Sequence, residues 1–193
     1  MKVLMILSMV LMAVFGSIIF AVDVRKFLDK VVFVNTWEGI GSGVVVGTNY
    51  VLTCFHLDHE FFVQGLPAKI VKNDVRVDLV YLKTIQKYEN FAQLTKIAVL
   101  GEKVYVVGYA DGRKTFLTGY IARIERGFIL IDAKVIQGLS GGGVFNENGE
   151  LVGIVCAGIG YPDKLLMAVD FTTIKKFLNK DDNEKENEDF LLE

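Results

Sequence analysis

From Val31 onward, the chain consists mostly of short apolar segments rich in β-branched residues, separated by turns that often contain glycine, at intervals of about eight to twelve residues. The chain has 193 residues, with 19 glycines and only two prolines, a balance that favours tight turns over a Pro-rich linker. The pattern therefore predicts an all-β protein, a sandwich or a barrel. The expected strands lie within residues 31–34, 43–46, 50–53, 69–71, 75–77, 79–82, 104–107, 116–121, 128–131, 142–145, 151–156 and 165–169.

The strand pattern is interrupted once, by a more polar stretch from Gln86 to Lys96. This stretch is the expected connection between two β halves. Near the end of the body, Ile174, Phe177 and Leu178 have the spacing of one face of a helix, which predicts a short C-terminal helix.

The N-terminus carries the least polar stretch of the chain. Val3 to Val22 form 20 residues without a charge, after Lys2, which is about the length that a helix needs to cross a bilayer. Residues 1–22 are therefore expected to be a signal peptide, with Ala21 as the small residue before the cut, or an uncleaved membrane anchor. Either reading predicts an exported body, periplasmic or extracellular, or one held at the membrane by this segment.

The charge distribution excludes a nucleic-acid partner. The formal net charge is −2, and no basic cluster stands out. Residues 180–193 hold seven acidic residues and two lysines, which predicts a solvated, flexible tail. Two cysteines, Cys54 and Cys156, are too few for a disulfide-rich scaffold or a four-cysteine zinc site.

Three residues in different segments point to nucleophilic catalysis. Ser140 lies in the string Gly-Leu-Ser-Gly-Gly, where the backbone can turn sharply and its N–H groups can converge on an oxygen. His56 follows an apolar strand and is placed to act as a base. Asp78 opens another strand, where a carboxylate needs a hydrogen-bond partner such as an imidazole N–H. Asp58 and Asp74 are rival acids, but neither opens an apolar strand.

Together these segments resemble the trypsin-like (chymotrypsin-fold) serine peptidases, most closely the bacterial Deg/HtrA type. The similar strings are Gly41–Val46, Thr53–His56, Asp78–Lys83 and Asp132–Gly142. The resemblance implies two antiparallel six-stranded β-barrels with the active site in the cleft between them. It places barrel 1 at about residues 31–85, barrel 2 at about 97–170 and the helix at 171–179, within a peptidase domain of residues 23–179.

The resemblance also implies the roles of the site residues. Ser140 is the nucleophile, His56 the general base and Asp78 the residue that orients His56. The backbone N–H groups of Gly138 and Ser140 form the oxyanion hole, and no metal or organic cofactor is needed. The implied substrate-binding residues are Lys134, Gln137, Cys156, Ala157 and Gly158.

The pocket residues favour one of two specificities. Small Ala157 and Gly158 with apolar Val135 and Ile136 favour cleavage after Val, Ala, Ile or Leu. Lys134 would favour an acidic side chain only if its ammonium pointed inward, whereas lysines more often extend their heads to solvent. The resemblance also brings Cys54 and Cys156 close to Asp78, as a disulfide or, as we expect, as two free thiols.

Other functions are left as alternatives. A protease fold without activity would make the chain a peptide-binding or chaperone-like module. Two departures from the family pattern bear on it, Leu139 where the family usually has Asn or Asp and Gly143 where Pro or Ala is common. An esterase is disfavoured, because the strand–Ser–helix elbow is missing. His56 and His59 do not have the spacing of a zinc-peptidase motif. The expected partner is a protein or peptide substrate, no PDZ domain is expected after Leu178, and a homo-oligomer is left open.

Overall fold

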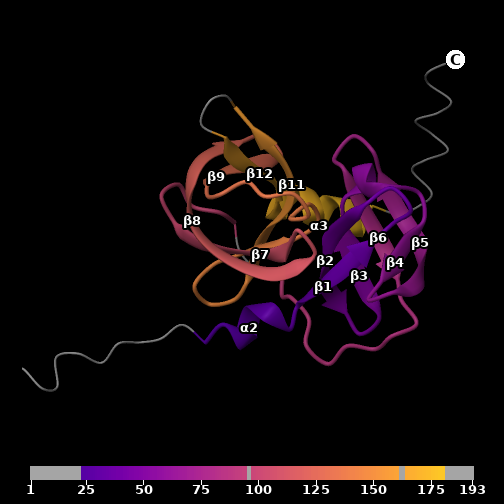
Figure 1. Cartoon of the computed structure of the whole chain (residues 1–193). Coiled ribbons are helices and arrows are strands. Elements are labelled where there is room, and N and C mark those ends of the chain that lie inside the picture. Colours follow the sequence, from indigo (N-terminus) through magenta and orange to yellow (C-terminus); the bar gives the residue numbers. More distant parts are fainter. Residues whose placement is uncertain (1–22, 95–96, 161–163, 181–193) are drawn as a thin grey trace, which may run out of the picture.

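The computed structural model describes residues 23–94, 97–160 and 164–180. Residues 1–22, with the expected signal or anchor, and the tail from residue 181 lie outside this description. In the described part of the chain, all strands belong to two closed antiparallel barrels, which lie side by side (Figure 1). The predicted fold class is therefore confirmed. No helix within the described residues is long and apolar enough to cross a membrane.

The first barrel has six strands in the order β1-β2-β3-β6-β5-β4. Its strands are β1 (Val31–Asn35), β2 (Ile40–Gly47), β3 (Tyr50–Thr53), β4 (Phe61–Val63), β5 (Leu66–Asp74) and β6 (Leu79–Lys83). A single 3-10 turn, η1 (Phe55–Leu57), follows β3. Alternating side chains of these strands fill the barrel with a small core of Val, Leu and Phe residues, as the period of two requires.

The second barrel repeats the same plan with the order β10-β11-β12-β9-β8-β7. Its strands are β7 (Lys103–Ala110), β8 (Arg113–Glu125), β9 (Phe128–Asp132), β10 (Gly143–Phe145), β11 (Leu151–Ile159) and β12 (Leu165–Asp170). The segment between β9 and β10 contains Ser140, and it lies at the interface, because the Ser140 carbonyl accepts the N–H of Ser42 in β2. Strands β1 and β2 also pack against β7.

The largest apolar cluster spans the boundary between the barrels. It joins Val44 and Leu52 of the first barrel to Phe145 and Ile154 of the second, and all four side chains are fully buried. The cluster removes apolar surface of both barrels from water, and this burial stabilises one relative position of the barrels. Residues at the interface are therefore presented on a rigid support.

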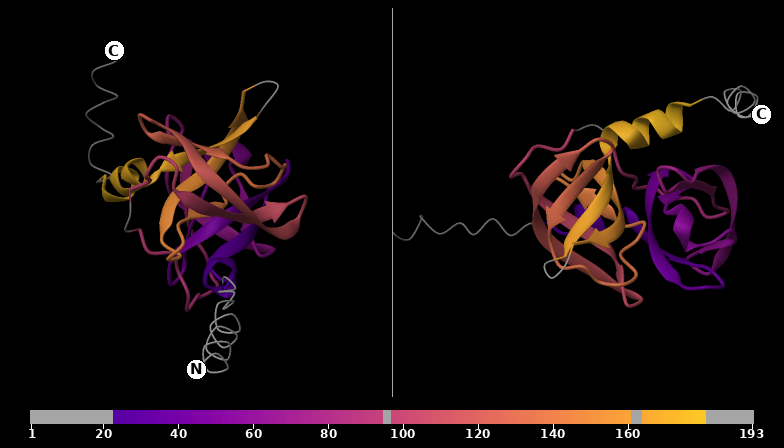
Figure 2. Two further views of the ribbon diagram at one scale, coloured as in Figure 1. Left: turned by 90° about the vertical axis from the view of Figure 1, so that its left-hand side faces the viewer. Right: turned by 90° about the horizontal axis from the view of Figure 1, so that it is seen from above.

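Two helices accompany the barrels in the described part of the chain. Helix α3 (Phe171–Asn179) begins where the Asp170 carboxylate accepts the N–H of Thr173 at 2.7 Å, a helix N-cap. It buries Ile174 and Phe177, contacts β11, β12 and β6, and so lies over both barrels (Figure 2). The short helix α2 (Arg25–Leu28) precedes β1.

The structure differs from the predicted strands at the end of β5. Residues 75–77, expected as a strand, form a turn between β5 and β6. The Arg76 guanidinium pairs with the Asp74 carboxylate at 3.0 Å across this turn. The alternation of Val and Arg in this stretch is typical of a strand, which explains the wrong expectation. In the structure the stretch is a turn with a local ion pair.

Candidate active site

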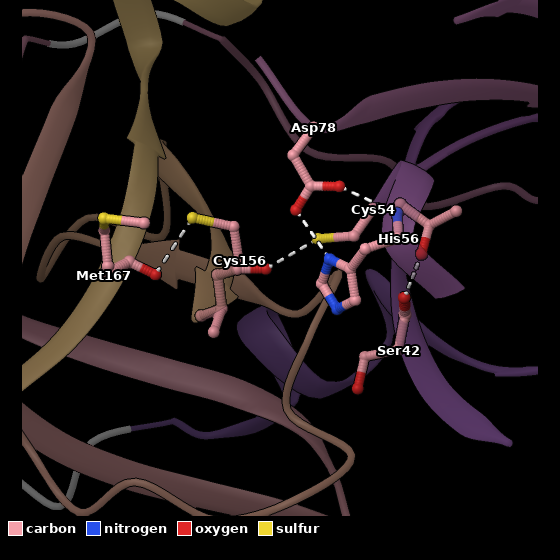
Figure 3. A network of polar contacts seen from close by, with 8 residues as sticks. Ser42, Cys54, His56, Asp78, Cys156 and Met167 are labelled. Atoms are coloured by element: carbon pink, nitrogen blue, oxygen red, sulfur yellow. Dashed lines mark hydrogen bonds and ion pairs between the residues drawn. The ribbon is translucent and has the colours of Figure 1, made fainter. Parts of the chain in front are cut away.

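His56 is held by one carboxylate. It lies in η1, directly after β3, and its ring extends from the end of that strand. The Asp78 carboxylate contacts it twice, with Oδ2 at 2.6 Å from His56 Nδ1 and Oδ1 accepting the His56 backbone N–H at 2.8 Å (Figure 3). An ionised carboxylate only accepts, so Nδ1 carries the shared proton and Nε2 is left as the basic nitrogen.

Asp78 occupies an uncommon backbone conformation. Its φ is 56°, in the left-handed region that a residue with a side chain rarely adopts. The turn is supported on both sides, because the Asp78 carbonyl accepts the N–H of Phe55 at 3.4 Å and its own N–H donates to Val75 at 3.4 Å. Such conformations persist where the surroundings enforce them, and they are frequent at functional sites.

The rival acids face other partners. The Asp74 carboxylate is hydrogen-bonded to Arg76, which lowers the pKa of Asp74. Asp58 accepts the backbone N–H of its neighbour His59 at 2.5 Å. The His59 ring packs against Phe55 with 5.4 Å between the centroids. Of the acids considered from the sequence, Asp78 is thus the one in contact with His56.

Ser140 lies in a loop whose backbone is fixed by glycines and by a buried side chain. Gly138 and Gly141 have φ values of 91° and 83°, which favour glycine, and Leu139 between them is only 2% exposed, inside the core of the second barrel. The Ser140 carbonyl accepts the N–H of Ser42 at 2.8 Å. Within the described ranges, the N–H groups of Gly138 and Ser140 have no hydrogen-bond acceptor, and no hydrogen bond joins Ser140 to His56.

Two hydrogen bonds connect the serine loop to the histidine strand. Ser42 binds Ser140 as described, and the Ser42 carbonyl accepts the hydroxyl of Thr53 at 2.7 Å, three residues before His56. The structure therefore brings His56 and Asp78 into direct contact and brings the Ser140 loop to the same side of the barrel interface. Ser42 was not assigned a role from the sequence. The available signal was a small polar residue between two glycines in an otherwise apolar strand.

The residues expected to line the substrate pocket fall into two groups. Cys156, Ala157 and Gly158 lie on β11, and a Cβ placed on Gly158 would stand 2.5 Å from a Val135 methyl group. Gln137 is exposed next to Gly138. Lys134 is exposed and lines a cavity of about 480 Å³ to which β11 contributes nothing; its other lining residues are Ala110, Asp111, Arg113, Thr115 and Ile136. The side chain beside Gly158 is therefore Val135 rather than Lys134.

Both cysteines are free, buried thiols. Cys54 Sγ donates to the Val155 carbonyl at 3.0 Å, and Cys156 Sγ donates to the Met167 carbonyl at 3.5 Å (Figure 3). Burial, together with the nearby charge of Asp78, raises the pKa of Cys54 well above its usual range and that of Cys156 to about 12. Both thiols are therefore protonated at neutral pH and act as small buried side chains.

One group of three side chains has the composition of a metal site. Ligand atoms of Cys54, His56 and Asp78 lie within 4.8 Å of one another. His56 Nδ1 and Asp78 Oδ2, however, are joined by their own hydrogen bond at 2.6 Å, and burial keeps the Cys54 thiol protonated. The His–Asp hydrogen bond accounts for this cluster, and we assign it no metal.

The contact with Asp78 has a consequence for pH dependence. The hydrogen bond from the His56 ring to Asp78 raises the pKa of His56 above its usual 6.5, against the opposing effect of burial. If neutral His56 is the base, kcat/KM should rise with pH through a midpoint above 6.5, because protonated His56 cannot take a proton. In Asp78→Asn the acid limb should move to lower pH. Rate profiles from about pH 5 to 9 check this; a limb unmoved in the variant would contradict it.

The two-barrel fold, with a His–Asp pair at one strand end and a glycine-flanked serine at the interface, defines the class of trypsin-like serine peptidases. Residues 41–154 match the family described as "Trypsin-like peptidase domain". The chain belongs to this family.

Two curated relatives of the Deg/HtrA type match the chain. The chain is 30% identical to the periplasmic pH-dependent serine endoprotease DegQ of Escherichia coli, over 74% of this chain and 40% of that protein. It is 27% identical to a serine protease HtrA-like of Staphylococcus aureus, over 73% of this chain and 23% of that protein. The chain therefore spans well under half the length of these relatives.

The structural match is consistent with these relatives. A serine endoprotease from Yersinia pestis superposes with a TM-score of 0.70 and 28% identity, over 80% of this chain and 63% of that one. The HtrA-type protease AlgWS227A with tripeptide, at 23% identity, matches with a TM-score of 0.72 over 80% of this chain and 60% of that one, which supports the fold alone.

Proposed function

We propose that this chain is a serine endopeptidase that hydrolyses peptide bonds of protein substrates outside the cytoplasmic membrane. The observation that carries the proposal is the double contact of Asp78 with His56, at 2.6 Å to the ring and 2.8 Å to the backbone. This contact fixes the ring in the tautomer that leaves Nε2 basic. Catalysis by a serine hydroxyl depends on such a base, because the hydroxyl holds its proton at neutral pH.

In the proposed mechanism, His56 Nε2 takes the proton of the Ser140 hydroxyl while Ser140 Oγ attacks the substrate carbonyl carbon. The C–N bond then breaks, His56 returns the proton to the leaving amine, and an acyl-enzyme remains on Ser140. Water, activated by the same histidine, releases the acid and restores the hydroxyl. Asp78 stabilises the imidazolium without taking its proton.

The N–H groups of Gly138 and Ser140 are proposed to bind the oxyanion. They support this role because neither has an acceptor among the described residues. Donors of this kind each contribute about 3–4 kcal/mol to lowering the barrier. The reaction needs no metal or organic cofactor.

The proposed location rests on two observations outside the site. Residues 3–22 carry no charge over 20 positions. The relative DegQ is described as periplasmic. Together they support export of the peptidase domain, either free or held at the membrane.

For the residue before the cut bond we propose Val, Ala, Ile or Leu. Val135 gives Gly158 an apolar neighbour, whereas Lys134 lines a separate, open cavity. Incubation of the full chain with a peptide library, followed by mass spectrometry, tests both activity and preference. We expect cleavage, predominantly after these aliphatic residues. Dominant cleavage after Glu or Asp that is lost in Lys134→Ala would overturn the preference, and peptides bound but never cut would identify the alternative binding module.

A further inference from the structure

Ser42 is a polar residue buried completely at the boundary between the barrels. Every polar atom of this residue has a partner. Its hydroxyl donates to the Gly138 carbonyl at 2.8 Å and accepts the N–H of Tyr109 at 2.7 Å. Its N–H donates to the Ser140 carbonyl, and its carbonyl accepts the Thr53 hydroxyl (Figure 3 shows the latter contact). A buried hydroxyl with two fixed partners is oriented, because Tyr109 occupies a lone pair and the proton is left for Gly138.

The partners of Ser42 are the carbonyl groups of the two residues proposed to form the oxyanion hole. Each peptide unit from residue 137 to 141 is held by one hydrogen bond to its carbonyl. Gln137 accepts the N–H of Asp111 at 2.9 Å, and Leu139 accepts the N–H of Gly142 at 2.8 Å. The alternate units, whose carbonyls belong to Gly138 and Ser140, receive both of these carbonyl bonds from Ser42. Their N–H groups donate to the Ile136 carbonyl at 3.4 Å and to the Val155 carbonyl at 2.7 Å.

This alternation fixes the directions of the free N–H groups. A peptide unit is planar and trans, so its N–H points opposite to its C=O. The Gly138 N–H is directed by the bond at the Gln137 carbonyl, and the Ser140 N–H by the bond at the Leu139 carbonyl. The unit between these two is the one bound by the Ser42 hydroxyl. Without that bond, this unit would be held only by the 3.4 Å bond from the Leu139 N–H to the Ile136 carbonyl, and the angle between the two N–H groups would be less firmly fixed.

The surroundings of Ser42 leave no spare room where it meets the loop. A Cβ on Gly108 would stand 2.9 Å from both the Ser42 hydroxyl and Leu139, and one on Gly141 would stand 1.9 Å from the Ser42 carbonyl. Both glycines are thus required for the close approach of Ser42 to the loop. A side chain of the first barrel is thereby packed directly against a loop of the second.

We propose that Ser42 is a positioning residue that holds the Gly138–Ser140 loop with both N–H groups aimed at the oxyanion. This inference rests on the proposed function, since it concerns the same site. Ser42 touches no substrate in this role. It acts through the Gly138 and Ser140 carbonyls, and it makes the oxyanion hole depend on correct packing of the two barrels.

The test is steady-state kinetics of Ser42→Ala in the full chain. We expect kcat for a peptide amide to fall about 10- to 100-fold, less than the loss from removing an oxyanion donor outright, with KM changed less than about twofold. The Ki of a peptide boronic acid, which forms a tetrahedral adduct, should rise by a similar factor. The acid limb of the pH profile should stay in place, because the His56–Asp78 contact is untouched. Ser42→Cys, which keeps the size and a weak donor, should be intermediate.

Thr84→Val is the matched control. Thr84 is a buried hydroxyl that donates to the Gln86 carbonyl at 2.8 Å, and it lies just beyond the end of β6 that is remote from Asp78. It should lose stability without losing kcat. If Ser42→Ala keeps kcat within about twofold of the parent, or loses no more than Thr84→Val, the inference is wrong. If Ser42→Ala does not fold, Ser42→Cys carries the test. A parent chain without peptidase activity would instead refute the proposed function.

Discussion

Replacing Ser140 by alanine should lower kcat for peptide hydrolysis by about a factor of 10⁶, because the reaction loses its nucleophile and the base has no hydroxyl to activate. The fold should persist. The Ser140 backbone, not its side chain, makes the hydrogen bond to Ser42, and that bond survives the substitution. Burst kinetics with an activated ester, together with labelling by a fluorophosphonate probe and peptide mapping, measures the effect at the proposed nucleophile itself.

Thr118→Ala provides the control for a lost hydroxyl outside the site, since Thr118 is exposed on β8. It should label and hydrolyse like the parent chain. Labelling of Ser140→Ala at the parent rate, or a probe attached to another residue, would show that the nucleophile is misassigned. Residual hydrolysis well above the uncatalysed rate is expected, because the oxyanion donors remain.

The sequence predicts a structural feature well when neighbouring residues produce it, and poorly when contacts between distant residues do. The all-β prediction succeeded because strand alternation and turns depend on a few neighbouring residues, whereas the arrangement in two barrels came from the family resemblance. The turn at residues 75–77 was missed, because Val-Arg-Val has the pattern of a strand, whereas the structure has a turn there with the Arg76–Asp74 ion pair across it. The pairing of His56 with Asp78 was predicted with the help of the resemblance to trypsin-like peptidases, since 22 residues separate the two in the chain.

The features that sequence reasoning missed are produced by contacts between distant segments. The Ser42 hydroxyl bonds a carbonyl 96 residues away, and nothing in the string Gly-Ser-Gly announces that partner. The position of Lys134 was also open, because its distance from Ser140 along the chain does not say which way its side chain leaves the loop.

Of the variants proposed for this chain, Phe27→Ala should lose the most free energy of unfolding. Phe27 is fully buried, although it lies in α2, before the first barrel begins. Its ring packs against three aromatic rings of the second barrel, with centroid distances of 5.0 Å to Tyr105, 5.5 Å to Phe116 and 5.9 Å to Phe145. The segment before β1 therefore packs against the second barrel, although the strand that follows it belongs to the first.

Neighbouring contacts support the same attachment. Lys26 donates to the Glu147 carbonyl and Lys30 to the Gly149 carbonyl, the latter at 2.8 Å, while the Lys30 carbonyl accepts the N–H of Val45 at 2.8 Å. The α2 segment thus contacts both barrels at once. Deleting the Phe27 ring leaves a cavity at the point where this segment, β7, β8 and β10 meet.

We expect Phe27→Ala to lower the free energy of unfolding by about 3–5 kcal/mol, the usual cost of removing a buried aromatic ring. For a chain of this length, the midpoint of thermal unfolding should fall by roughly 10 °C. Val24→Ala, one turn earlier and 39% exposed, is the control and should cost less than about 1 kcal/mol. Urea unfolding of both variants, followed by circular dichroism, gives the comparison. None of the three rings against which Phe27 packs belongs to the proposed site, so kcat per folded molecule should stay unchanged. Equal losses of stability in the two variants would show that α2 does not hold the barrels together.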